Sequence, residues 1–385
     1  MSVFAVICEY NPFHNGHKYL IEQVKKDGDT VIAVMSGSFT QRGDVAVSDK
    51  FSRAETALRN GADLVIELPA VFAYSNAETF ARGGVEIANS LNVVDKLCFG
   101  AEDADINLLK LAGEAFEDKR FKKELKKYMD SGEYYPRAVK KTLEEVYSPA
   151  LASVVEKPNN ILAVEYIKAL SGTGIEPVAV KRIGAAHDST EVEDNITSAS
   201  NIREMIKSGK NFSPFVPNYT INNPADIKRL ERIILYKLRT MSKEEIKKLP
   251  DVSEGLENRI YDAARSSKSL DELFEAIKTK RYTMARIRRI AVSALLNIKS
   301  EDSKTSAKYI RVLAFNEKGA HLLSQIKEKG SLPLITNVAD GYNSLNDDAK
   351  KMFDIDILAT DTFNMALSEI KACGEDFTKG VIKLW

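Results

Sequence analysis

Two of the four histidines in this chain of 385 residues flank a single glycine, in the segment His14-Asn15-Gly16-His17. The segment follows a short apolar run at residues 3–8 and opens a helical pattern, so it is predicted to form a strand-to-helix turn. A helix N-terminus presents unpaired N–H groups and partial positive charge, which suit a phosphate. Gly16 lets a bulky ligand approach the backbone. On one helical face, both imidazoles could donate hydrogen bonds to one phosphate.

Two histidines at this spacing are also compatible with a metal site or with a chance pairing. No nearby cluster of Cys, His or carboxylate side chains completes a metal site, so we predict no metal held by the protein itself. Cys8, Cys98 and Cys373 are isolated, and they fit neither a disulfide framework nor a CxxC metal site.

The elements that would position the histidines alternate between strand and helix. Short apolar or β-branched runs at 3–8, 30–35, 63–68, 96–100 and 176–181 are typical of strands buried on both faces. Their alternation with helical segments predicts an α/β, Rossmann-like parallel sheet. In such sheets ligands bind beyond the carboxyl ends of the strands, near the topological switch point. The histidine segment is expected there.

We expect two domains. A catalytic domain is predicted over residues 1–212, with a charged helical insertion at about 103–147. A mostly helical C-terminal domain is predicted over 213–385, with helices at 225–239, 243–249, 254–265, 269–278 and 283–298 and two strands near 308–315 and 332–338. The boundary segment 211–224 holds three prolines and four asparagines, a composition typical of a linker or long loop.

Charge gives a mixed indication about nucleic acid. Lys plus Arg and Asp plus Glu each number 55, which argues against binding through overall charge but not against a local patch. The segment 278–289 holds six basic residues and no acid, together with Tyr282, and it is either a solvated helix face or an RNA contact. The candidate RNA contacts are Lys278, Lys280, Arg281, Arg286, Arg288 and Arg289.

No apolar run reaches the roughly 18 residues of a membrane helix. The apolar start lacks the basic residues of a signal peptide, and the cysteine usage fits a reducing cytoplasm. We therefore predict a cytoplasmic protein without a membrane partner, and no feature predicts a stable protein partner.

The strand–HxGH–helix pattern resembles the nucleotidyltransferase superfamily, which transfers a nucleotidyl group and releases pyrophosphate. Members carry a second signature of the S-x-T-x-I-R type. The matching segment here runs from Ser198 through Ser200 to Arg203, with serine in place of threonine and the hydroxyl kept. The resemblance implies that His14, His17, Ser198, Ser200 and Arg203 are catalytic. Arg203 would hold the β- and γ-phosphates by charge-assisted hydrogen bonds.

A closer resemblance covers most of the chain. The segments EYNPFHNGH, MSGSFTQRG, GADLVIELP, CFGAE, KPNNILAVEYIKAL and TKRYTMARIRR together resemble the bacterial tRNA(Met) cytidine acetate ligase family. This resemblance implies that ATP, with Mg²⁺ on its triphosphate, activates acetate to acetyl-adenylate. The acetyl group then passes to N4 of the wobble cytidine of elongator tRNA(Met).

The resemblance also implies ATP contacts on both sides of the histidines. The expected ATP contacts, besides the two histidines, are Ile7, Cys8, Glu9, Tyr10, Asn11, Pro12, Phe13, Asn15, Gly16, Lys18, Tyr19, Leu20, Gly100, Asn159, Asn160, Arg182 and Ile183. The two asparagines are also suited to capping a helix. His187 is a weaker candidate.

Acetate is expected near Ser36, Gln41 and Arg42, because Arg42 is a natural carboxylate partner. Lys50 and Arg53 are further candidates. The segment TMSKE, 240–244, looks like a mobile KMSKS loop, but Ser242 and Glu245 are better interpreted as a capping box.

Two other functions remain open from the sequence. One is a small-molecule nucleotidyltransferase, which the long basic helical half disfavours. The other is an RNA-binding protein without activity, which the intact HNGH and SASNIR segments disfavour.

Overall fold

The computed structural model describes residues 1–133, 135–183, 195–218, 221–253 and 255–385. Within this part of the chain, eight strands form one sheet, with β8 paired to β6 beside the main order. The main order is β5 (Glu176–Lys181), β4 (Lys96–Ala101), β1 (Val3–Cys8), β2 (Thr30–Ser36), β3 (Leu64–Leu68), β6 (Ile310–Asn316) and β7 (Leu334–Ile335), and β8 is Ile382–Leu384.

The first five strands are parallel, and their bounds agree with the prediction to within one residue. The chain moves outward from β1 through β2 to β3, and then crosses to β4 and β5 on the other side of β1. The strand order therefore reverses between β1 and β4, and a ligand crevice is expected beyond their carboxyl ends. The α/β fold prediction is confirmed.

Helices cover both faces of the sheet because alternate strand residues point to opposite sides. Phe4 and Val6 of β1 pack in one apolar cluster with α1 (Asn15–Val24) and α2 (Lys50–Arg59). Ala5 and Ile7 pack in a second cluster with α4 (Ala77–Ser90) and α9 (Pro158–Ala169). β1 is therefore buried on both faces, as its continuous apolar sequence predicts.

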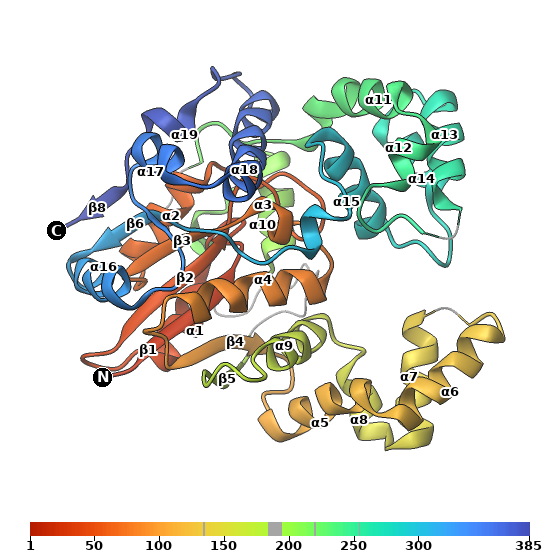
Figure 1. Ribbon diagram of the computed structural model, residues 1–385, viewed down its shortest axis with the longest axis horizontal. Coiled ribbons are helices and arrows are strands. Elements are labelled where there is room, and N and C mark those ends of the chain that lie inside the picture. The colour runs from red at the N-terminus through yellow and green to blue at the C-terminus, as the bar shows by residue number, and fades with distance from the viewer. Residues whose placement is uncertain (134, 184–194, 219–220, 254) are drawn as a thin grey trace.

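Two helical units extend from the sheet toward the right of Figure 1. The lower one corresponds to the predicted insertion, and the upper one to the predicted helices after residue 225. The lower unit comprises α5 (Ile106–Glu117), α6 (Lys119–Asp130), α7 (Tyr135–Val146) and α8 (Pro149–Val154). The upper unit comprises η2 (Ile227–Leu230), α11 (Glu231–Thr240), α12 (Lys243–Lys247), α13 (Leu256–Ser266), α14 (Leu270–Ile277) and α15 (Met284–Leu295).

The last part of the chain returns to the sheet instead of extending the helical unit. Strand β6 pairs antiparallel with β3, and both β7 and β8 pair with β6. This differs from the predicted division, which assigned residues 213–385 to one mostly helical domain. The two strands near 308–315 and 332–338 were expected, but local sequence does not say which sheet edge a strand joins. The accompanying elements are η3 (Asp302–Lys304), α16 (Glu317–Lys329), α17 (Val338–Ser344), α18 (Asp347–Ala366) and α19 (Glu375–Thr378).

A buried ion-pair network connects β6 and α19 of this C-terminal part to α2 and β3. Lys50 of α2 lies 2.8 Å from Glu67 of β3 and 2.9 Å from Asp376 of α19. Arg311 of β6 contacts the same two carboxylates at 2.9 and 2.8 Å. All four side chains are buried, and each cation faces two acids, so the charges compensate one another inside the protein.

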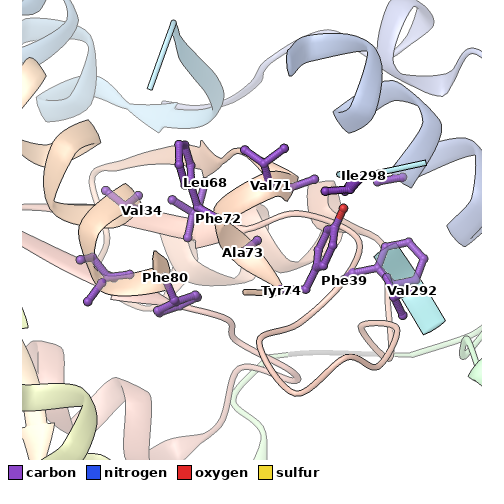
Figure 2. Close-up of a cluster of buried hydrophobic side chains, with 14 of the residues drawn as sticks. Val34, Phe39, Leu68, Val71, Phe72, Ala73, Tyr74, Phe80, Val292 and Ile298 are labelled. Atoms are coloured by element: carbon purple, nitrogen blue, oxygen red, sulfur yellow. The ribbon is translucent and has the colours of Figure 1, made fainter. Parts of the chain in front are cut away.

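Figure 2 shows the apolar cluster that anchors α15 to the sheet domain. Phe39, from the loop after β2, is 1% exposed and shares this cluster with Tyr74 and with Val292 of α15. Helix α3 (Ala70–Ala73) contributes Val71 and Phe72. The loop after β2 is therefore packed directly against the helix that carries part of the basic segment.

No helix among the described residues is long and apolar enough to span a membrane.

Candidate active site

A cavity of about 290 Å³ opens at the carboxyl ends of β1 and β4. The cavity is bounded by the turn between β1 and α1, the loop after β2, the N-terminus of α9, the residues after β5 and the start of α10 (Ala199–Lys207). Segments far apart in the sequence meet here, at the switch point of the sheet. This is where a nucleotide is expected to bind in an open α/β fold.

His14 and His17 form a reciprocal cap at the start of α1. The Nδ1 atom of His14 accepts a hydrogen bond from the Gly16 backbone N–H at 3.1 Å, and Nδ1 of His17 accepts from the His14 N–H at 3.2 Å. Their rings are stacked, with centroids 3.8 Å apart. His14 is the N-cap and His17 is the N3 residue, so the two rings lie together on one side of the helix start.

These hydrogen bonds determine which ring nitrogen carries the proton. A neutral imidazole whose Nδ1 accepts a hydrogen bond carries its proton on Nε2. Burial lowers the pKa of His14 to about 3, and nearby Arg182 and Arg203 act in the same direction. Burial, His14 and Arg182 likewise lower the pKa of His17. Both rings are therefore neutral near pH 7 and present Nε2–H donors.

The second signature supplies one cation and two hydroxyls to the same cavity. Ser198 is the N-cap of α10 and accepts from the Asn201 N–H at 3.1 Å. Arg203 donates from Nη1 to the Asn11 carbonyl at 2.7 Å, and its Nη2 lies 3.4 Å from the Ser200 hydroxyl. Ser198, Ser200 and Arg203 all line the cavity, so the structure brings the five predicted catalytic residues together.

The strand ends opposite the histidines add further lining residues. Gly100, Asn159, Arg182 and Ile183 line the cavity, and burial lowers the pKa of the Arg182 guanidinium. Asn160 differs from the prediction of a nucleotide contact. It is fully buried and does not line the cavity, because its side-chain amide donates to Asp103 at 2.8 Å.

Only part of the stretch from Ile7 to Leu20, which includes the turn between β1 and α1, lines the cavity. Four of its predicted ATP contacts do not line the cavity, namely Pro12, Phe13, Asn15 and Lys18. Phe13 is fully buried, Asn15 donates to the carbonyls of Asn195 and Pro214, and Lys18 faces Glu22. The remaining residues do line it, namely Ile7, Cys8, Glu9, Tyr10, Asn11, His14, Gly16, His17, Tyr19 and Leu20.

The predicted acetate residues are only partly brought together. Gln41 and Arg42 line the cavity, and the Gln41 N–H donates to the Glu9 carboxylate at 2.6 Å. Ser36 is fully buried and does not line the cavity. Its carbonyl instead accepts a hydrogen bond from the buried Arg53 at 3.0 Å.

Lys50 and Arg53 do not reach the cavity either. Lys50 belongs to the ion-pair network described above. Arg53 is fully buried and donates to the carbonyls of Glu9 at 2.6 Å, Ser36 at 3.0 Å and Gly37. Arg53 therefore holds the ends of β1 and β2 in place, a structural role that the sequence does not reveal.

The basic segment has two environments. Lys278, Lys280 and Arg281 are exposed, and Lys278 lies 3.3 Å from Glu275. Arg286 donates to the Asp251 carbonyl and Arg289 to the Asp251 carboxylate, at 2.8 and 2.9 Å. The tertiary structure thus brings an acid to a segment that contains none.

Tyr282 does not offer a stacking surface for a base, because its side chain is 8% exposed. Arg288 is half-buried on the same helix as Arg289. The interpretation of the TMSKE segment is confirmed, since Ser242 and Glu245 form a capping box at the start of α12. His187 lies outside the described residues.

The described residues contain no group of three or more His, Cys, Asp or Glu side chains arranged to hold a metal ion.

Comparison with known proteins assigns the chain to a family. A family model described as HIGH Nucleotidyl Transferase matches residues 1–376. The tRNA(Met) cytidine acetate ligase of Thermoanaerobacter sp. (strain X514) is 40% identical over 405 residues, with 100% of both chains covered. The chain belongs to the tRNA(Met) cytidine acetate ligase family. The Acetivibrio thermocellus protein of that name is 37% identical, covering 99% of this chain and 100% of its own.

Solved structures agree with this assignment over the whole chain. The crystal structure of Thermotoga maritima TmcAL in its apo form has a TM-score of 0.94 at 33% identity, with 100% of both chains covered. The structure of the same protein bound with alpha-thio ATP has a TM-score of 0.91 at 32% identity, again with full coverage. Family membership therefore extends through the helical units as well as the sheet.

Proposed function

We propose that this protein is an ATP-dependent ligase that activates acetate as acetyl-adenylate, with release of pyrophosphate. It transfers the acetyl group to N4 of the wobble cytidine of elongator tRNA(Met), with release of AMP. The observation that carries the proposal is the meeting of HNGH, SASNIR and the Gln41–Arg42 loop at one cavity. Relatives named tRNA(Met) cytidine acetate ligase and a neighbour bound with alpha-thio ATP support it.

In the first step, an acetate oxygen attacks the α-phosphorus of ATP and pyrophosphate leaves. Negative charge shifts onto the phosphate oxygens, so fixed donors and cations provide most of the catalysis. The Nε2–H groups of His14 and His17 and the N-terminus of α1 bind the phosphates as neutral donors. Arg203 and Arg182 add positive charge at the same cavity.

Acetate binds on the side formed by the loop after β2. Arg42 is the carboxylate partner there, and Gln41 lines the same region. Mg²⁺ bound to the triphosphate, mostly through phosphate oxygens and water, would neutralise part of the charge of ATP.

In the second step, the N4 amine of the cytidine attacks the acetyl carbonyl and AMP leaves. The tRNA backbone contacts the exposed residues of the basic segment, with Arg288 beside them on α15. Helix α15 is packed on the loop that lines the cavity, so an RNA bound there lies near the adenylate. The reaction takes place in the cytoplasm, where ATP and tRNA occur together.

The test is incubation of the protein with ATP, Mg²⁺, labelled acetate and bulk tRNA. Label in N4-acetylcytidine is the expected result. A protein that forms no AMP in response to acetate would overturn the proposal. His17→Ala serves as the inactive control, because it removes one of the two phosphate donors.

A further inference from the structure

Glu9 is the single carboxylate among the described residues that line the cavity. It follows β1 directly and precedes the turn that carries His14 and His17. Its carboxylate accepts the Gln41 N–H at 2.6 Å, so it also touches the loop expected to bind acetate. Glu9 therefore lies between the phosphate side and the acetate side of the cavity.

The acetyl transfer needs a proton acceptor, and among the described cavity residues the histidines and arginines do not supply one. The Nδ1 atoms of His14 and His17 already accept backbone N–H groups, and their Nε2 atoms carry protons. The arginines at the cavity are donors only. A carboxylate has about four acceptor positions, and Gln41 occupies one of those on Glu9.

We propose that the Glu9 carboxylate accepts a proton from the N4 amine of the cytidine during acetyl transfer. This inference rests on the proposed function. Carboxylates are natural partners of cytosine, because N4 presents an N–H donor and glutamate offers an acceptor. The same contact would orient the base, so recognition and proton transfer use one group.

The atoms of the step balance without a further reactant. The N4 lone pair forms a bond to the acetyl carbonyl carbon, and the bond from that carbon to the phosphate oxygen of AMP breaks. One N4 proton moves to Glu9, and AMP leaves as an anion. Glu9 then releases the proton to solvent.

The surroundings of Glu9 suit a base that works near neutral pH. Burial raises the pKa of Glu9, which makes the carboxylate more basic than an exposed glutamate. The Gln41 N–H and the charges of Arg203, Arg42 and Arg53 oppose that rise and hold the ionised form in place. Cys8 and Tyr166 also face Glu9, with burial raising the pKa of each, so both are neutral.

The experiment measures adenylate formation and acetyl transfer separately in the Glu9→Gln variant. The substituted amide keeps an oxygen for the Gln41 N–H but offers no carboxylate to take a proton. Acetate-dependent pyrophosphate exchange reports the first step, and acetylcytidine formed from supplied acetyl-adenylate and tRNA reports the second. We expect the rate of acetyl transfer to fall by about 100-fold or more. The rate of pyrophosphate exchange should fall by less than about tenfold. The wild-type transfer rate should fall in acid as Glu9 is protonated, and Glu9→Gln should lack this acid limb.

Glu102→Gln is the matched control. Glu102 is another carboxylate at a strand end, but it does not line the cavity and instead accepts the Asn160 N–H at 2.9 Å. We expect this variant to keep the wild-type pH profile of transfer. Thermal unfolding checks that each variant is folded, and Glu9→Asp, which keeps a carboxylate, should retain the acid limb.

Two results would overturn the inference. One is a Glu9→Gln enzyme that transfers acetyl at the wild-type rate with the wild-type pH profile. The other is an equal loss of exchange and transfer, which would assign Glu9 to substrate binding. Failure of the proposed function is distinct, because the wild-type protein itself would then show neither acetate-dependent exchange nor transfer.

Discussion

Gly43 lies directly against the backbone of Arg289. A Cβ atom on Gly43 would overlap the Arg289 nitrogen and would lie 2.6 Å from the Arg288 carbonyl carbon. The φ angle of Gly43 is +72°, a backbone conformation that residues other than glycine rarely adopt. The loop that lines the cavity and the helix that carries part of the basic segment therefore meet at a point where only glycine fits.

The first prediction concerns this contact. Gly43→Ala should lower the free energy of unfolding by about 1–3 kcal/mol more than Gly172→Ala, measured by urea denaturation. Gly172 has a similar φ of +81°, but no atom lies within 4 Å of its added Cβ. It therefore reports the backbone strain alone, about 1 kcal/mol. Equal losses in the two variants would show that the packing of Gly43 on α15 is unimportant.

A second prediction concerns the phosphate donors. His17→Ala should lower acetate-dependent pyrophosphate exchange by about 100-fold or more, because it removes an Nε2–H donor and the cap on His14. Binding of tRNA, measured by filter retention, should survive because the basic segment lies on other elements. Glu22→Ala, an exposed change on the same helix, is the control. Loss of tRNA binding in His17→Ala would contradict the prediction that ATP and tRNA bind at separate sites.

A third prediction concerns RNA binding. Arg288→Ala should weaken tRNA binding and reduce the slope of log K against log salt by about 1, if Arg288 contacts one phosphate. Lys327→Ala removes one exposed charge from α16, on the opposite side of the molecule in Figure 1, and should change neither quantity. An unchanged affinity and slope in Arg288→Ala would exclude this residue from the RNA contact.

A fourth prediction concerns pH and stability. Burial and the charge of Glu67 raise the pKa of Asp356 from 3.8 to about 7. The protonated carboxyl therefore stabilises the folded state fully below about pH 4, and this contribution is lost as pH rises through 7. Wild-type stability should fall relative to Asp356→Asn by up to about 1.4 kcal/mol for each pH unit in that window.

Urea unfolding between pH 4 and 8 measures this difference. The asparagine side chain in Asp356→Asn mimics the protonated carboxyl, and its oxygen can still accept the Ala70 N–H that Asp356 accepts at 2.7 Å. Asp354→Asn, an exposed change on the same helix, should keep the wild-type pH dependence. Parallel pH curves for the wild-type protein and Asp356→Asn would show that Asp356 titrates at an ordinary pKa.

Much of the fold could be predicted because its signals are local. The five parallel strands are continuous apolar runs, and their bounds follow from composition alone. The capping box of Ser242 and Glu245 lies within four residues, so it too could be predicted. The strand near 308–315 was predicted, but its pairing with β3 was not, because that pairing joins residues about 250 positions apart.

The candidate site shows the same division between local and distant information. The residue types and spacing of HNGH indicated a phosphate site. Nothing in the sequence shows that the side-chain amide of Asn160 donates to Asp103 and that this residue lies outside the cavity lining. The sequence also could not show that Asp251, from another part of the helical unit, binds Arg286 and Arg289.

By itself, the sequence determined which segments form strands and helices, and it located the two histidines at a strand-to-helix turn. These properties depend on neighbouring residues. Only the tertiary structure decided the protonation of those histidines, the burial of Arg53 and the contact between Glu9 and Gln41. Those properties depend on solvent exclusion and on groups brought together by folding, and no local pattern encodes either.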